Sequence, residues 1–292
     1  MKPSSRTAAH LSLQVIVLLW GCTAILGRQI SIQAIPLVWY RLLIVIGVLA
    51  IYVPARGISL RVPLRAAVRY ALVGAFIGAH WLCFYGAIKV AGIATAVVSL
   101  STSTFFTALV EPLVFRRRLR AGELAIGALV VVAAGLLMQV ELHATPVGFA
   151  LGLGSAVLAA TFGVLNGKLA HAEPPERLML YELTAATVVV SAFVPWSFVV
   201  PPAADLGWLS VLAVVCTVVP QVWIIYVLRT LSPFTVSVAV NLEPVYSLIL
   251  AAALFGETLS VRFYAAAAVL FALVLLNAVR RSASTSTMPA PE

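Results

Sequence analysis

The sequence predicts an all-α integral membrane protein whose ten transmembrane helices form two inverted five-helix repeats. Three observations lead to this fold class. Hydrophobic residues make up 62% of the chain and charged residues only 10%, whereas a soluble domain carries roughly 25% charged residues. The apolar residues gather in ten runs, and crossing a bilayer takes about 20 such residues. Finally, one shift of 140 residues superimposes the two halves of the chain.

The ten apolar runs define the predicted helices in chain order. The least distinct boundary separates the third and fourth runs, where only Lys89 and two small residues interrupt the apolar pattern. The matching break in the second half, "RTLSPF", is clearer because Ser232 and Pro233 favour a turn. The runs cover residues 11–27, 36–53, 68–89, 94–115, 123–140, 147–169, 178–198, 208–228, 235–255 and 261–279.

Basic residues predict the orientation of these helices. If the N-terminus lies in the cytoplasm, fifteen of the 19 Lys and Arg residues fall in cytoplasmic segments, three fall outside and Arg41 falls within a span. Membrane proteins carry such an excess of Lys and Arg in their cytoplasmic loops. We therefore expect both termini in the cytoplasm. The net charge of +9 then reflects topology, and no nucleic-acid partner is expected, because no loop is long enough to build a basic binding face.

The repeat is clearest around the fourth and ninth runs, where residues 89–119 lie over residues 229–259 without a gap. Each half holds five runs, and because five is odd, the second half must enter the membrane from the opposite side. This is a common construction of secondary transporters, since two such halves can pack in two nearly equivalent ways. The predicted units are residues 1–140 and 141–280, followed by a disordered polar tail at 281–292.

Three GxxxG patterns predict close packing between helices. Gly74 is followed by Gly78, and the same spacing recurs at 148 and 152 and at 163 and 167. Glycine at this spacing lets two backbones approach each other.

Enzyme signatures are absent from the sequence. There is no P-loop, HExxH motif or GxSxG motif. The four histidines fall in four separate segments, which argues against a metal site. Asp205 is the only aspartate and lies in a loop, so an intramembrane pair of catalytic aspartates is missing. We expect no enzyme activity, no cofactor and no metal.

Polar residues within the spans are the candidates for a binding site, because polar groups in hydrocarbon are costly and usually face a bundle interior or a watery cavity. They recur at equivalent depths: under the 140-residue shift, "HW" at 80–81 overlies "PQ" at 220–221, and Ser101 and Ser103 overlie Asn241 and Glu243. The predicted substrate-binding residues are Trp20, Thr23, His80, Trp81, Tyr85, Ser99, Ser103, Gln221, Asn241 and Glu243, and the predicted hinges are Pro220 and Pro244.

Several of these polar residues have a second interpretation. His80 also fits a hydrogen-bonded packing residue, and the hydroxyls of "SLSTST" can bond to carbonyls of their own helix. Arg41 is expected to extend toward the outer surface. Glu111 is expected to pair with the arginines that follow it at 116–118, and Glu182 fits either a structural or a functional role.

The "NLEP" stretch places an acid and a helix breaker side by side in the ninth run. Pro244 lacks the backbone donor for the carbonyl of Val240, so the helix should bend between them. Two roles remain open for Glu243. It accepts hydrogen bonds as a structural strut, or it binds a substrate amine or carries a coupling proton.

The stretch "AVNLEPVYSLILAAALFGETLS", with "LLWGCTAILGR" in the first run and "VWYRLLI" in the second, resembles the EamA-type members of the drug/metabolite transporter superfamily. The acid–proline pair and the later "GE" turn carry the resemblance, together with the ten spans and the inverted repeat. One departure is the fourth run, where such proteins often have a proline near the position of Thr104. Here the only acid–proline pair of that run, Glu111–Pro112, lies nearer the inner end.

The resemblance implies a multi-pass protein of the bacterial inner membrane that exports small metabolites, notably amino acids. Phosphorylated substrates fit less well, because Arg41 is the only basic candidate at mid-membrane. The alternatives are a transporter of other small organic solutes or drugs, an intramembrane enzyme and a non-transporting scaffold. The expected partners are a small-molecule substrate and the lipid bilayer. The oligomeric state stays open, and a monomer is compatible with the predicted fold.

Overall fold

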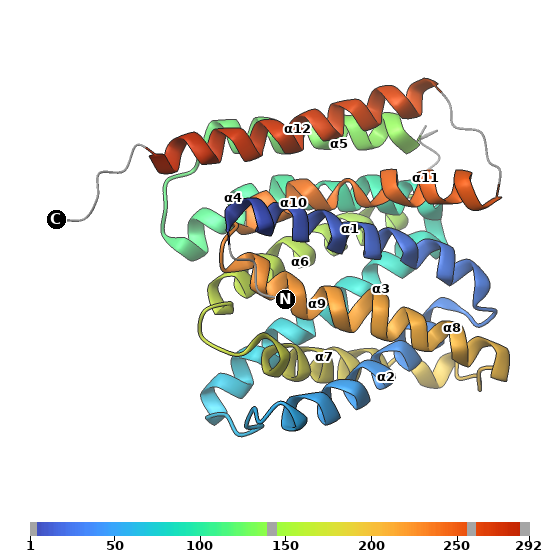
Figure 1. The fold of residues 1–292 in the computed structure, drawn as a ribbon. Coiled ribbons are helices and arrows are strands. Elements are labelled where there is room, and N and C mark those ends of the chain that lie inside the picture. Colours follow the sequence, from blue (N-terminus) through green and yellow to red (C-terminus); the bar gives the residue numbers. More distant parts are fainter. Residues whose placement is uncertain (1–4, 139–144, 256–260, 287–292) are drawn as a thin grey trace.

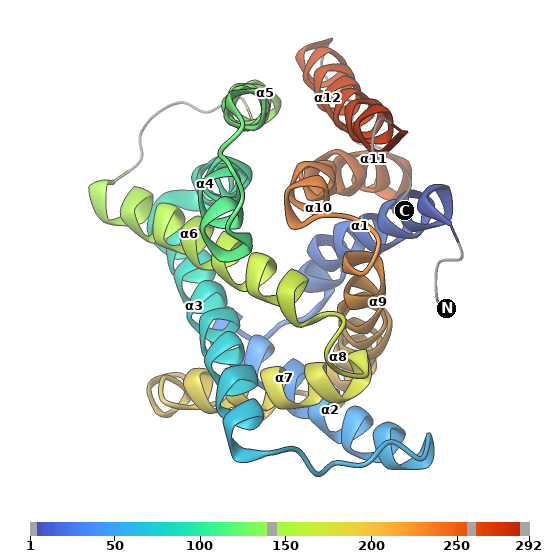
Figure 2. The same ribbon diagram turned by 90° about the vertical axis from the view of Figure 1, so that its left-hand side faces the viewer.

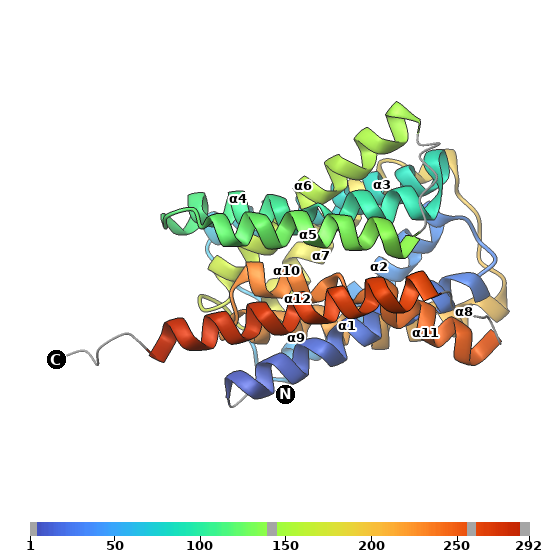
Figure 3. The ribbon, with the colours of Figure 1, turned by 90° about the horizontal axis from the view of Figure 1, so that it is seen from above.

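The computed structural model describes residues 5–138, 145–255 and 261–286. Every regular element among them is helical, and most of the helices run along one common direction (Figures 1 and 3). Eight segments are long and apolar enough to cross a membrane, and the shorter helix Ala121–Leu136 is also apolar. The prediction of an all-α membrane protein is therefore confirmed.

The helices follow the predicted runs closely. The first half contains α1 (Arg6–Gln29), α2 (Ala34–Ala55), α3 (Leu64–Ser101), α4 (Ser103–Phe115) and α5 (Ala121–Met138). The second half contains α6 (Pro146–Leu169), α7 (Pro175–Ser191), α8 (Ala203–Ala213), α9 (Val219–Leu228), α10 (Pro233–Val240), α11 (Glu243–Phe255) and α12 (Val261–Ser286). A 3₁₀ turn at Val194–Trp196 follows α7, and a π-helical turn at Val214–Val218 joins α8 to α9.

Three boundaries differ from the prediction. The third and fourth runs share one assigned helix, α3, although the apolar spans separate into Leu64–Ile88 and Thr95–Phe115. Helix α7 ends at Ser191 rather than at 198, and Pro195 stands in the turn that follows it. Helix α12 continues to Ser286, into the segment predicted as a disordered tail. The rest of that tail, at 287–292, lies outside the described residues.

Side chains cap the starts of several helices. The hydroxyl of Ser5 accepts a hydrogen bond from the Ala8 amide at the start of α1. Thr145 plays the same role for α6, and Ser232 for α10. In the last two the cap is followed by a proline at the first helical position, where its missing N–H is no loss.

Apolar side chains on the outside of the bundle fit a lipid environment. Leu113 is 77% exposed and Val261 is 84% exposed, and many other large apolar side chains on the surface are also exposed. A soluble protein rarely shows such extensive apolar surface. We therefore treat the outer faces of these helices as lipid-facing.

Helices at equivalent positions of the two halves lie against each other. Contacts join α2 to α7, α5 to α12, and α4 to α10. Viewed along the helices, α5 and α12 occupy one edge of the bundle and α2 and α7 the opposite edge (Figure 2). The 140-residue shift relates α2 to α7 and α5 to α12, while α4 and α10 are parts of the fourth and ninth spans, which the same shift relates.

Two of the spans are broken at equivalent depths. Helix α3 ends at Ser101 and α4 begins at Ser103, while α10 ends at Val240 and α11 begins at Glu243. In the ninth run the break precedes Pro244. In the fourth run no proline stands at the break; instead Thr102 and Ser101 donate hydroxyl hydrogen bonds to carbonyls three residues earlier, and such bonding bends helices.

The two broken spans are bonded to each other where they break. The side-chain amide of Asn241 donates to the Thr104 hydroxyl over 2.8 Å and to the Ser237 carbonyl over 2.8 Å. Thr104 in turn donates to the same Ser237 carbonyl. The Thr104 hydroxyl thus links the two halves of the molecule.

The first GxxxG pair sits where α3 packs against α7. A methyl group on Gly74 would lie 2.0 Å from the backbone oxygen of Glu182, and one on Gly78 would lie 2.9 Å from that of Ala186. Only glycine allows the two backbones to approach this closely at Gly74. In the third pair, Gly163 instead borders the cavity described next.

Candidate functional site

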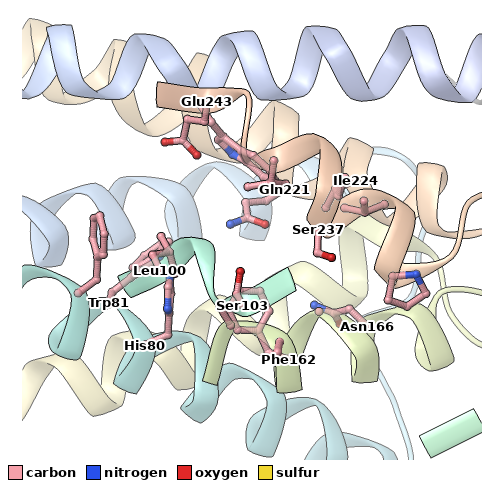
Figure 4. A pocket seen from close by; sticks show the side chains of 18 of the residues that line it. His80, Trp81, Leu100, Ser103, Phe162, Asn166, Gln221, Ile224, Ser237 and Glu243 are labelled. Atoms are coloured by element: carbon pink, nitrogen blue, oxygen red, sulfur yellow. The ribbon is translucent and has the colours of Figure 1, made fainter. Parts of the chain in front are cut away.

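A cavity of about 250 Å³ lies inside the helix bundle, next to the two helix breaks. Residues of α1, α2, α3, α4, α6, α9, α10 and α11 line it, together with the π-helical turn. Figure 4 shows His80 and Trp81 on one side of this space and Glu243 on the other, with Gln221, Ser103 and Asn166 further along. Both halves of the chain therefore contribute to its wall.

Eight of the ten predicted substrate-binding residues line this cavity. The eight are Trp20, Thr23, His80, Trp81, Tyr85, Ser103, Gln221 and Glu243. The helix periodicity places Trp81 and Tyr85 on one face of α3, as expected for residues four positions apart. The structure thus brings these side chains together, and their contact with substrate stays a prediction.

The other two predicted binding residues lie outside the lining. Ser99 is 1% exposed and packs against Gly152 of α6, where a methyl group on the glycine would lie 2.5 Å from the serine Cβ. Asn241 is committed to the hydrogen bonds with Thr104 and Ser237. Both residues serve helix–helix packing in this conformation, because their side chains rotate toward a neighbouring helix and away from the cavity.

Neither of the two predicted hinge prolines lines the cavity. Pro220 follows the π-helical turn, whose residues Cys216 and Thr217 do line it. π-Helical turns are rare and often lie at functional sites. Pro244 is the second residue of α11, directly after the break. Both prolines thus stand at irregular helix segments beside the cavity, and hinge motion at them stays a prediction.

His80 is held by a polar contact on the side of α6. Its Nδ1 lies 2.9 Å from the carbonyl oxygen of Ser155 and 2.9 Å from the hydroxyl of the same residue. Phe84 and Phe162 pack against the ring. This geometry fits the packing interpretation of His80, and the ring also forms part of the cavity wall.

Glu243 faces the cavity without a side-chain partner. The structure shows no hydrogen bond or ion pair from its carboxylate to any of the described residues. A strut would accept hydrogen bonds from a neighbouring helix, so the geometry gives no support to the structural role. The side chain is half-buried, and a carboxylate that is shielded from water is costly unless a charge or a hydrogen bond within the cavity compensates it.

Arg41 corrects an expectation from the sequence. Rather than extending to the outer surface, it is 6% exposed and lines the cavity. Its guanidinium carbon lies 4.2 Å from the centre of the Trp81 ring. Trp39, two residues earlier, donates instead to the Ser191 hydroxyl of α7. The rotation of α2 against α3 decides which of these neighbouring side chains points inward, and the sequence does not encode that rotation.

A model of the EamA-like transporter family matches the chain twice, over residues 7–139 and 146–279. The chain belongs to the EamA-like transporter family. This membership confirms the resemblance drawn from the sequence, and it points to a membrane transporter rather than an enzyme.

Two relatives of this EamA-like chain extend the comparison. It is 27% identical over 307 aligned positions to a protein of Salmonella typhimurium strain LT2 described as a probable amino-acid metabolite efflux pump, an alignment that covers 97% of this chain and 99% of the relative. A solved crystal structure matches 94% of the chain and 99% of its own length with a TM-score of 0.81 at 19% identity. The second match shows a shared fold.

Asn166 of the EamA-like chain also lines the cavity and was missed by the sequence reasoning. Its side-chain amide donates to the Glu182 carboxylate over 3.0 Å, and Glu182 is fully buried behind it on α7. The sequence held a signal for Asn166, because it is a polar residue within an apolar run and because Glu182 was left with either a structural or a functional role. Glu182 is thus bonded to a residue of the cavity wall, but it does not line the cavity itself.

Glu111 forms the predicted ion pair at one end of the bundle. Its carboxylate lies 3.1 Å from the Arg117 guanidinium. The other carboxylate oxygen accepts a hydrogen bond of 2.7 Å from the backbone amide of Phe234, near the start of α10. A negative charge is favourable at this position of a helix. Glu111 therefore joins α4 to α10 and is structural.

Proposed function

We propose that this EamA-like transporter exports small metabolites, and amino acids above all, across the bacterial inner membrane. The observation that carries the proposal is the cavity inside the bundle, bordered by both broken spans. Its volume of about 250 Å³ suits a small solute. A site of this kind combines an apolar wall with a few convergent polar groups, and this one has both.

The lining favours a substrate with both polar and apolar parts. Aromatic rings come from α1 and α3, hydroxyl and amide groups from α4 and α9, and a single carboxylate from Glu243. Arg41 adds a positive charge, but Glu243 balances it, so a dianionic phosphate fits less well than a zwitterion. The description of the Salmonella relative as an amino-acid metabolite efflux pump supports the same substrate class.

Transport would proceed by alternating access between two five-helix repeats, at residues 1–140 and 141–280. Three features support this: the equivalent breaks in the fourth and ninth spans, the pairing of equivalent helices across the molecule, and the two matches of the family model. Two inverted halves have two nearly equivalent packings, and exchanging them moves a central cavity from one membrane face to the other. We expect Pro220 and Pro244 to serve as hinges in that exchange.

Uptake into proteoliposomes tests the proposed function. Purified protein is reconstituted and offered a panel of labelled amino acids, with empty liposomes as the control. Saturable, protein-dependent accumulation of at least one amino acid is expected. Uptake of none of them, with uptake of other organic solutes or drugs instead, would favour the alternative substrate class. No saturable uptake of any solute would contradict transport itself and favour a scaffold.

A further inference from the structure

Arg41 has an unusual environment for an arginine in a membrane. It is almost fully buried, yet its Nε has no hydrogen-bond partner in the described part of the chain, and no carboxylate there forms an ion pair with it. Its guanidinium lies over the face of Trp81. Stacking on an aromatic face holds a guanidinium in place while leaving its edge of N–H donors free.

The charge that balances Arg41 lies across the cavity but does not touch it. Among the described residues that line the cavity, Glu243 carries the only carboxylate and Arg41 the only guanidinium. The Arg41 guanidinium lies over the Trp81 ring, and Trp81 and Glu243 stand on opposite sides of the space in Figure 4. Opposite charges that are shielded from water and form no direct ion pair are costly unless something between them completes their hydrogen bonds.

We infer that Arg41 binds the carboxylate of the substrate (the carboxylate seat) and that Glu243 binds its ammonium group (the ammonium seat). The substrate is then an α-amino acid with both groups free. This inference rests on the proposed function and specifies how that site recognises its substrate. The guanidinium edge presents two parallel N–H donors that match a carboxylate. The opposed signs fix the orientation of the backbone of the substrate within the cavity.

The remaining wall indicates which side chain the site accepts. The lining also contains Phe162, Ile224 and Leu228, and Figure 4 shows Ile224 beyond Gln221 as seen from Trp81. With the charged groups of the substrate held at Arg41 and Glu243, its side chain points toward this part of the cavity. There the polar side chains of Ser237 and Asn166 stand beside the apolar ones. The apolar residues there suit an amino acid with an apolar side chain such as leucine, which serves as the test substrate.

Competition by analogues tests the carboxylate seat. Uptake of labelled leucine into proteoliposomes is measured in the presence of three unlabelled competitors. They are leucine itself, leucinamide, which lacks the carboxylate, and 4-methylpentanoate, which lacks the amine. In the parent protein, leucinamide should compete at least about tenfold less well than leucine, because charge-assisted hydrogen bonds are lost. In Arg41→Gln the two should compete almost equally, since the group that distinguishes them is gone.

Two variants control the measurement. Arg65→Gln makes the same change at an exposed position of α3 and should keep the parent preference for leucine over leucinamide. Glu243→Gln should keep that preference but lose the preference for leucine over 4-methylpentanoate. Arg41→Lys keeps the charge without the planar fork and should retain a reduced preference for the carboxylate.

The outcomes separate this inference from the proposed function. If Arg41→Gln or, where that variant does not assemble, Arg41→Lys distinguishes leucine from leucinamide as the parent does, Arg41 is not the carboxylate seat. A parent protein that takes up leucine but does not distinguish it from leucinamide overturns the inference as well. Failure of the parent to take up any amino acid contradicts the proposed function instead.

Discussion

Glu243 is the residue whose role the structure narrows most. It lines the cavity and bonds to no neighbouring helix among the described residues. Arg41, which faces the same space, was expected at the surface. Arg41 and Glu243 therefore place two opposite charges in one cavity. A substitution that removes the charge of Glu243 but keeps its size tests whether the charge matters.

We expect Glu243→Gln to reduce amino-acid uptake at least about tenfold, because glutamine keeps the shape of the side chain but removes the charge that holds an ammonium group. The measurement is initial uptake in proteoliposomes at matched protein content. Parent-like uptake by the variant across about pH 5.5 to 8, a window that spans the raised pKa values seen for carboxylates in proteins, would show that Glu243 is a strut after all.

The aromatic face of α3 leads to a second prediction at the residue scale. Trp81→Ala removes both a wall of the cavity and the ring on which Arg41 rests, whereas Tyr85→Ala removes only a wall. We expect both variants to be expressed normally and to transport less, with the larger loss in Trp81→Ala. Normal uptake by both would show that α3 does not line the substrate path.

At the scale of the elements, the packing of α3 on α7 depends on a missing side chain. Gly74→Ala would place a methyl group 2.0 Å from the backbone oxygen of Glu182, and a helix backbone yields far less than a flexible side chain. We expect a loss of stability of about 1–3 kcal/mol, the usual range for overpacking, measured as a lower midpoint of thermal unfolding in detergent.

Gly47→Ala is the matched control, since nothing lies within 4 Å of the added methyl group on α2. It should unfold at or slightly above the parent temperature, because alanine favours a helix more than glycine does. Equal midpoints for the two variants would show that α3 and α7 move apart at little cost.

The two broken spans are interrupted by different residue types. Proline marks one break in the sequence, at Pro244, but the equivalent break at Thr102 has no such marker. Hydroxyl groups that bond back to the helix replace it there. Their effect depends on whether each hydroxyl turns inward or outward, so the Ser/Thr run alone did not predict a break.

At the scale of the whole molecule, orientation is the prediction to test. Helix α1 begins and α12 ends at the same end of the bundle (Figures 1 and 3), and the excess of basic residues predicts that this end is cytoplasmic. A reporter that is active only in the periplasm, fused after Glu292, should give no signal, while a cytoplasmic reporter should give a strong one. High periplasmic activity would reverse the predicted orientation.

The sequence by itself determined the class of protein and the positions of most spans. Hydrophobicity and charge act locally, residue by residue, and the membrane imposes the same requirement on every span. For this reason the apolar runs matched the helices to within a few residues at most ends. The polar positions within them also identified eight of the residues that line the cavity, because such groups are costly anywhere else in the bilayer.

Tertiary structure decided which way each polar side chain faces. Arg41 and Asn166 point into the cavity, while Ser99 and Asn241, which are also polar and lie within spans, point into helix contacts. Within a helix, a rotation of a fraction of a turn exchanges a cavity-facing side chain for one that packs. That rotation is set by the packing of neighbouring helices, which here includes the glycine contacts of α3, and it exists only when both halves of the chain are assembled.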